Sequence, residues 1–367
     1  MSAAHARSAG APASTRHRPP WYRRGVGRTG RRIGCLVALA ALVACGRGTE
    51  RQAAVDATTT TRGPAGPVDG TDARPADEAG AGDPAEVLAP SEADGDATAA
   101  AVDVPGPAFD AAETSAEPAS NRLADRIPPP PGFTRVPVED GSFGAWLRDL
   151  PLQPGRPPVL LFDGREKGNQ RAHFAVVDVS VGDRDLQQCA DAVMRLRAEW
   201  LFAAGRGDEI AFDFTSGERV DFRRWSQGWR PRVADHRVTW SRGGRPGSSH
   251  DDLLAYLTRV YIYAGSASLA RELEPIAAEE LWAGDLFIRG GFPGHAVLVV
   301  DLARDDAGRT AFLLVQSYMP AQQIHVLVNP TDRSLSPWYP LEFGEQLYTP
   351  EWTFRRSEAK RFPSRPR

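Results

Sequence analysis

Cysteine is scarce in this sequence, with only three among 367 residues. Two of them, Cys35 and Cys45, lie in the N-terminal region, which leaves Cys189 alone in the rest of the chain. A lone thiol has no disulfide partner within the chain, and this excludes a disulfide framework. Because the sequence also lacks a CxxC pair and an HExxH motif, we expect no bound metal.

Motifs of several other classes are missing as well. The sequence has no Walker-type or dinucleotide-binding glycine loop, and we expect no cofactor. It has no basic stripe of the kind that binds nucleic acid, and no internal repeat. The apolar run at residues 33–45 is too short to span a bilayer.

The N-terminal region has the composition of a secretory signal peptide. Residues 1–32 carry eight arginines and no acidic residue, and a short apolar run with small residues follows. Its last four residues, at 42–45, resemble the bacterial lipobox, which implies that Cys45 is lipidated. Residues 1–45 are then a lipoprotein signal peptide, and the protein is anchored in a bacterial membrane facing the periplasm or exterior. The alternative is a plain signal peptide with incidental cysteines.

Composition changes again between residues 46 and 125. Ala, Gly, Pro, Thr, Asp and Glu dominate this stretch, which has no lysine and Phe109 as its only aromatic residue. Such a sequence cannot bury enough apolar surface to offset its conformational entropy, so we expect a disordered acidic tether. Residues 126–367 are long enough for a single globular domain with a sizeable core, and we expect it to be a monomer.

Apolar spacing in that domain predicts a mixture of helices and strands. Residues 183–205 repeat apolar side chains at three- and four-residue steps, with Asp185 as the expected cap and Gly205 as the end. One or two helices are expected at 250–276, broken near Gly265. Strands are expected at 157–164, 173–182, 209–217, 284–291, 295–301, 310–320 and 323–330. Because the helices precede a strand-rich C-terminal region, the fold class is α+β.

Cys189 lies in the first turn of the expected helix at 183–205. Unpaired backbone N–H groups and the helix dipole favour negative charge there, which lowers the pKa of a thiol and makes it a better nucleophile. The alternative is packing, because Cys189 lies on the apolar face and free cysteine is often buried.

His295 follows a glycine-rich turn and opens an apolar run, which would fix its imidazole at the edge of a cleft, as a general base requires. A turn histidine bonded to a nearby carbonyl is the alternative. One strand further on, Gln316 follows four apolar residues, and a buried glutamine needs a partner. Its amide oxygen could hold one imidazole N–H and leave the other nitrogen for a thiol.

These stretches resemble the papain-like pattern, in which His-Ala-Val opens one strand and the next ends in Asn-Ser-Trp. The alignment implies that His295 is the base and Gln316 the third catalytic residue, with Ser317 and Tyr318 after it. The sequence CADAVMRLRAEWL at 189–201 resembles the nucleophile helix of bacterial cell-wall cysteine peptidases. The resemblance implies a papain-like fold, with a central helix that carries the Cys packed on a C-terminal antiparallel sheet. The sequence departs from the pattern in having Gln in place of Asn.

A longer resemblance covers most of the domain. The motifs QCADAVMRLRAEW, GGFPGHAVLVVD, QSYMPAQQIHVLVNP and TPEWTF are similar to the uncharacterised bacterial family called domain of unknown function 4846. The resemblance supports a lipoprotein. Because that family has no established activity, the chemistry has to be argued from the residues.

Further side chains are candidates for the rim of the site. Gln188 could donate to an oxyanion at the start of the Cys189 helix. Ser216, Trp225, Trp229 and Tyr318 could contact substrate, although packing is the better interpretation for any single tryptophan.

Together these features predict a membrane-anchored thiol hydrolase outside the cytoplasm. It would act on amide bonds by a Cys189–His295–Gln316 triad, with peptidoglycan stem peptides as the substrate that the location favours. A non-catalytic cell-envelope binding lipoprotein with the same fold is the first alternative. An acyltransferase with the same triad is the second.

Overall fold

The computed structural model describes residues 120–235 and 237–363. The predicted signal peptide, Cys45 and the predicted tether up to residue 119 lie outside these residues. The short helix α1 (Leu123–Arg126) spans the expected start of the domain at residue 126, and its Leu123 is fully buried. In the ranges described, no helix is long and apolar enough to cross a membrane.

The helices precede most of the strands in the chain. After α1 come α2 (Phe143–Arg148), α3 (Cys189–Ala203), α4 (Phe222–Ser226), α5 (His250–Tyr263) and α6 (Ser266–Glu272). Four 3-10 turns are η3 (Gln170–Ala172), η4 (Gly207–Glu209), η5 (Ala278–Glu280) and η6 (Arg356–Glu358). The strands are β1 (Phe133–Arg135), β2 (His173–Val176), β3 (Ala211–Asp213), β4 (Arg219–Asp221), β5 (Trp229–Ala234), β6 (Arg237–Arg242), β7 (Glu274–Pro275), β8 (Leu286–Arg289), β9 (His295–Asp305), β10 (Thr310–Gln316), β11 (His325–Leu327), β12 (Tyr339–Pro340), β13 (Gln346–Tyr348), β14 (Thr353–Arg355) and β15 (Ala359–Arg361).

One large antiparallel sheet organises the fold, which confirms the α+β class. Its strand order is β2-β11-β10-β9-β8-β15-β7, with β1 also paired to β9 and β12 to β10. At its centre β9 pairs with β8 through Arg289↔His295 and with β10 through Val315↔Leu298, and β10 pairs with β11 through Gln316↔His325. The candidate residues His295 and Gln316 therefore lie at the same end of two neighbouring strands.

The central strands are apolar almost throughout because both faces of the sheet are covered. Successive side chains of a strand point to opposite faces. Leu298 and Val300 of β9 join the core under α3, whereas Val297 and Val299 join a second core on the opposite face. Phe354 of β14 belongs to this second core. A strand buried on both sides has no polar alternation to reveal its register.

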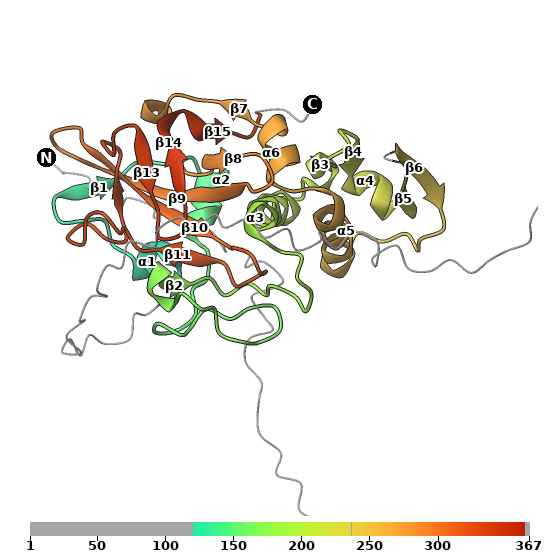
Figure 1. Cartoon of the computed structure of the whole chain (residues 1–367), viewed down its shortest axis with the longest axis horizontal. Helices are drawn as coiled ribbons and strands as arrows, with labels where there is room; N and C mark the ends of the chain where they lie inside the picture. The colour runs from blue at the N-terminus through green and yellow to red at the C-terminus, as the bar shows by residue number, and fades with distance from the viewer. Residues whose placement is uncertain (1–119, 236, 364–367) are drawn as a thin grey trace, which may run out of the picture. The chain divides into compact units, whose positions relative to one another are not determined.

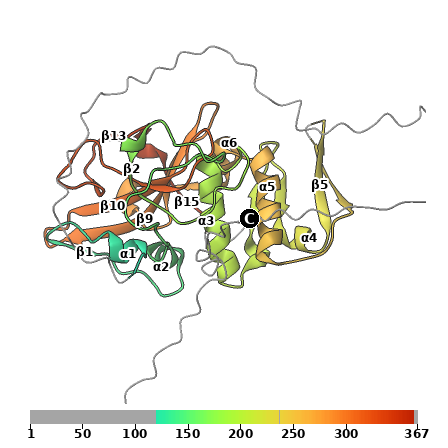
Figure 2. The ribbon, with the colours of Figure 1, turned by 90° about the horizontal axis from the view of Figure 1, so that it is seen from below.

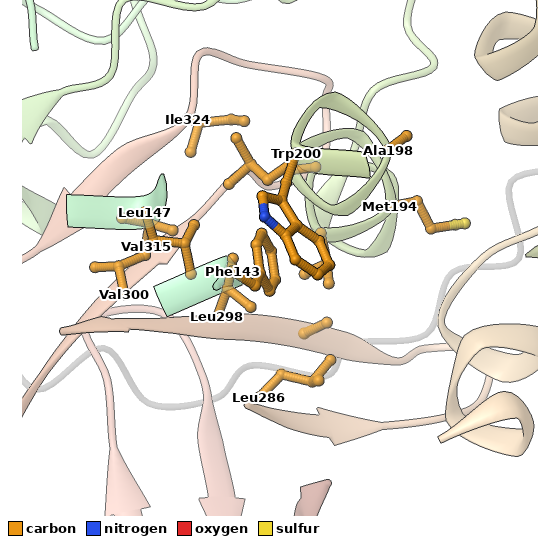
Figure 3. Packing of buried hydrophobic residues seen from close by; sticks show 14 of the residues in the cluster. Phe143, Leu147, Met194, Ala198, Trp200, Leu286, Leu298, Val300, Val315 and Ile324 are labelled. Carbon is orange, nitrogen blue, oxygen red and sulfur yellow. The ribbon is translucent and has the colours of Figure 1, made fainter. Parts of the chain in front are cut away.

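Helix α3 packs on the first face of the sheet. Figure 3 shows Trp200 of α3 beside Phe143 of α2, with Leu298 and Val300 of the sheet beneath them. The Phe143 and Trp200 ring centroids are 5.2 Å apart, and Trp200 Nε1 donates to the carbonyl of Gly141 at 3.0 Å. The indole is thus buried with its polar atom satisfied, which ties α3 to the loop before α2.

Helix α3 begins four residues later than the expected cap at Asp185. The first helical bond runs from Ala192 N to Gln188 O, so Gln188 is the N-cap, and its own N–H is accepted by Asp191 Oδ2 at 3.1 Å. Asp185 instead accepts the backbone N–H of Ala321 at 2.6 Å. A contact 136 residues away therefore decides where the helix starts, and Cys189 becomes its first residue.

The expected helical region at 250–276 is confirmed as two helices that break at Gly265. Ser249 starts α5 by accepting the N–H of Asp252, whose carboxylate accepts the N–H of Ser249 in return. Figures 1 and 2 place α5, α4 and the hairpin β5–β6 on the side of α3 away from the large sheet. The strand expected at 157–164 forms only isolated bridges, at Leu160 and Leu161.

Candidate active site

Cys189 is the first residue of α3 and lies against the start of β9. Its thiol is close to the backbone N–H groups of Ala296, Ala190 and Cys189 itself, and each of them favours the thiolate. Burial outweighs these groups and, with the nearby Asp191 carboxylate, raises the pKa of Cys189 to about 11. The residue is nevertheless partly exposed at the protein surface. The thiol is therefore protonated at neutral pH.

His295 begins β9 and is almost completely buried. Aromatic rings surround its imidazole: the centroid of Tyr318 is 4.8 Å away, that of Trp352 5.4 Å and that of Phe354 5.7 Å. Burial lowers the pKa of His295 to about 4, with a smaller contribution from the Lys167 ammonium, although the hydrogen bond that His295 donates to Gln316 opposes this. The ring is neutral at pH 7, which is the form that can accept a proton.

Gln316 ends β10 and holds the imidazole of His295. His295 Nε2 and Gln316 Oε1 are 2.9 Å apart, so the amide oxygen accepts the imidazole N–H. Among the described residues, no hydrogen bond engages the other ring nitrogen, Nδ1. The sequence suggested that the amide oxygen of Gln316 holds an imidazole N–H of His295, and the structure has this hydrogen bond.

No hydrogen bond joins Cys189 to His295 in this structure, although Cys189 contacts the N–H of the residue that follows His295. Proton-transfer contacts in substrate-free enzymes are often longer than in the reacting complex. Tyr318 lies beside both groups. Its ring contacts His295. The pKa of its phenol is raised mainly by burial, then by the charge of Glu351 and least by a negative charge on Cys189. The site thus places a thiol and a neutral imidazole in one neighbourhood, without preforming an ion pair.

Behind Gln316 is a buried polar cluster that the sequence did not suggest. Gln316 Nε2 donates to Glu351 Oε2 at 2.7 Å and is 3.4 Å from His325 Nε2. Glu351 forms an ion pair with Lys167, whose side chain is only 5% exposed. Lys167 is one of only two lysines in the whole sequence, and this rarity was the one sequence feature that set Lys167 apart.

The start of α3 is tied to the end of β10 by polar contacts. Ser317 Oγ is 3.0 Å from the carbonyl oxygen of Gln187 and 2.8 Å from that of Gln322. Gln188, the expected oxyanion donor, uses one side-chain N–H to bond Asp185 Oδ1 at 3.1 Å. These bonds hold the residues just before Cys189 against the loop that follows Gln316.

The expected substrate-contacting tryptophans lie elsewhere. Trp225 in α4 is buried against Tyr256, and Trp229 in β5 packs under Arg242. Ser216 is exposed in the turn between β3 and β4. This region follows the C-terminal end of α3, about 22 Å along the helix axis from Cys189. The structure brings Tyr318 to Cys189, but not Ser216, Trp225 or Trp229.

Neither a metal site nor a large hollow lies at Cys189 in the described part of the chain. In the part of the chain that the structure describes, no group of three or more His, Cys, Asp or Glu side chains could hold a metal ion. A surface hollow of about 320 Å³ is lined by Ala211 of β3 and by charged side chains of β4, α4 and η4, among them Asp208, Arg219 and Arg223. It lies with the Trp225 region rather than with Cys189.

One protein family matches the chain. The model of the family described as domain of unknown function (4846) matches residues 123–361, well over half of the sequence. No curated protein and no solved structure matches it.

Proposed function

The chain belongs to the family domain of unknown function (4846), and from its geometry we propose that it is a thiol hydrolase of amide bonds. The observation that carries the proposal is the Gln316-held His295 at the start of β9, where the backbone N–H of the next residue, Ala296, contacts Cys189 at the first position of α3. This combination supports a papain-like arrangement, with α3 as the helix that carries the nucleophile. Cys189, His295 and Gln316 are the proposed catalytic residues.

In the first half of the reaction, His295 Nδ1 accepts the proton of the Cys189 thiol as the sulfur attacks the substrate carbonyl carbon. The carbonyl oxygen becomes negatively charged, and N–H groups at the start of α3, together with Gln188, stabilise it. The amide C–N bond then breaks, and the imidazolium returns the proton to the leaving nitrogen. The products are a free amine and a thioester on Cys189.

The second half regenerates the enzyme. His295 Nδ1 accepts a proton from water as the water oxygen attacks the thioester carbonyl. The C–S bond breaks, a carboxylic acid leaves, and the proton returns to the sulfur. Gln316 keeps the imidazole oriented through both halves by accepting the N–H of Nε2.

The proposed substrate class follows from location. With a lipid on Cys45, the domain would be tethered outside the cytoplasm, where peptidoglycan stem peptides present amide bonds. The anchor, this substrate and the envelope location rest on the sequence and are parts of the proposal.

The test measures turnover together with thiol reactivity in the full chain. We expect hydrolysis of stem-peptide amides by the wild type, a thioester adduct of matching mass on Cys189, and no turnover by Cys189→Ala. At pH 7 the alkylation of Cys189 by iodoacetamide should fall about 100-fold in His295→Ala, the size of a general-base contribution. His250→Ala is the control, because His250 bonds Glu199 between α3 and α5, away from the thiol.

One observation favours the alternative of a binding lipoprotein with a structural cysteine: burial raises the pKa of Cys189 instead of lowering it. If alkylation is equally slow in the wild type and His295→Ala, and no amide is hydrolysed, Cys189 is a packing residue. The proposed hydrolase is then wrong.

A further inference from the structure

In the Lys167–Glu351–Gln316 cluster, the chemistry of the groups decides which one donates each hydrogen bond and which one accepts it. An ionised carboxylate can only accept hydrogen bonds, and the side-chain amide can donate only through nitrogen. The bond of 2.7 Å between Gln316 and Glu351 therefore requires the NH₂ group of Gln316 to face Glu351. A rotation of the amide by 180° would place two oxygens against each other.

His325 imposes the same orientation independently. Its Nδ1 is 2.9 Å from the carbonyl oxygen of Gln323, which can only accept, so Nδ1 carries the proton. Burial lowers the pKa of His325 to about 3, so its other nitrogen, Nε2, is an acceptor. This nitrogen faces the Gln316 NH₂ group at 3.4 Å. Two acceptors thus leave the amide oxygen pointing to His295.

We infer that Glu351, held by Lys167, is a positioning residue that sets the tautomer of His295 through the amide of Gln316. Because Gln316 Oε1 can only accept, a neutral His295 must carry its proton on Nε2, and the lone pair of Nδ1 is left for the proton of Cys189. The consequence for catalysis rests on the proposed function. The tautomer itself does not.

Lys167 supplies the charge that keeps Glu351 an acceptor inside the protein. A buried carboxylate is expensive unless it is paired. The Lys167 ammonium pairs with Glu351 Oε1, and Glu351 Oε2 is left for Gln316. The ammonium also lies 5.5 Å from the centroid of the Tyr318 ring, which packs on His295. Neither Lys167 nor Glu351 contacts Cys189, so both act through other residues.

The experiment reads the tautomer directly by ¹⁵N NMR of histidine-labelled full chain, with a His295→Asn spectrum to assign the signal. We expect the wild type to show the Nε2–H form. In Glu351→Gln, whose amide can present either an oxygen or an NH₂ group to Gln316, an Nδ1–H population should appear. The His295-dependent alkylation rate of Cys189 at pH 7 should then fall about tenfold.

A double variant separates this role from simple charge balance. Lys167→Met with Glu351→Gln removes both buried charges, so it should recover the stability lost in Glu351→Gln but keep the mixed tautomer. If the double variant regains the wild-type tautomer and rate, Glu351 is only the counter-ion of Lys167, and the inference is wrong. Asp285→Asn, which breaks a buried ion pair with Arg361, is the control and should change neither readout.

The two proposals fail in different ways. A tautomer that is unchanged in Glu351→Gln, together with His295-dependent alkylation in the wild type, would overturn this inference and keep the hydrolase. A tautomer that shifts, in a protein whose alkylation does not depend on His295, would support the inference and overturn the hydrolase.

Discussion

At the scale of single residues, the reactivity of Cys189 is set by opposing neighbours. The helix start and the N–H of Ala296 favour the thiolate, whereas burial and the charge of Asp191 disfavour it. Asp191 is itself buried, and burial raises its pKa well above the usual value. The helix position alone predicted a lowered thiol pKa, and this prediction is wrong because burial is the larger effect.

The charge of Asp191 can be removed with little change in shape. In Asp191→Asn the amide oxygen can still accept the N–H of Gln188, as Asp191 Oδ2 does at 3.1 Å. We expect the apparent pKa of Cys189, measured from iodoacetamide alkylation between pH 6 and 11, to fall. Asp183→Asn, an exposed change in the preceding loop, is the control and should leave it unchanged. An unchanged pKa in Asp191→Asn would mean that burial alone protects the thiol.

At the scale of elements, Asp301 joins β1 and α2 to the central strand. Its carboxylate is fully buried in β9 and accepts from Arg135 Nε and Arg148 Nε, each at 2.6 Å. The sequence predicted a strand that ends at this residue. Strand β9 instead continues to residue 305, so the carboxylate lies inside the sheet, where it needs positive partners.

Loss of this carboxylate should destabilise the fold. Asp301→Asn leaves two guanidinium groups without their buried partner, and we expect the free energy of unfolding to fall by about 3–5 kcal/mol in urea titrations. Asp305→Asn, in the same strand, removes a pair with the exposed Arg309 and should have little effect. Equal midpoints for the two variants would contradict the structural role of Asp301.

At the scale of the whole molecule, buried titratable groups make stability depend on pH. Burial lowers the pKa of His295 to about 4 and that of His325 to about 3, both below the ordinary value of 6.5. Between these values the unfolded chain binds protons that the folded chain does not, so stability is lost as pH falls below 6.5. Glu272 acts in the opposite sense, because burial raises its pKa to about 7 and disfavours the fold as pH rises from 4.5.

Asp191 and Asp285, whose pKa values burial also raises, act in the same sense as Glu272, so the contribution of one histidine is tested by itself. Because His325→Leu cannot titrate, we expect this variant to lose less stability than the wild type, in urea midpoints, between pH 6.5 and 4.5. His250→Leu changes a histidine that is partly exposed and serves as the comparison. A loss of stability that His325→Leu leaves unchanged would show that its burial does not contribute to acid sensitivity.

The sequence by itself determined much of the local structure and the family. Apolar spacing located α5, α6 and the C-terminal strands, and a long run of motifs identified the family. The pairing of His295 with Gln316 also followed from order along the chain, because neighbouring strands joined by a short turn place their residues side by side.

Only the tertiary structure decided the start of α3, the burial of Cys189 and the cluster behind Gln316. Asp185 accepts the N–H of Ala321, Gln316 bonds Glu351, and Glu351 pairs with Lys167, across separations of 136, 35 and 184 residues. Local patterns report which residues share a helix face or a strand face, because those periods are properties of the backbone. They do not report which distant polar group fills a buried hydrogen-bond position, because that depends on how the elements pack.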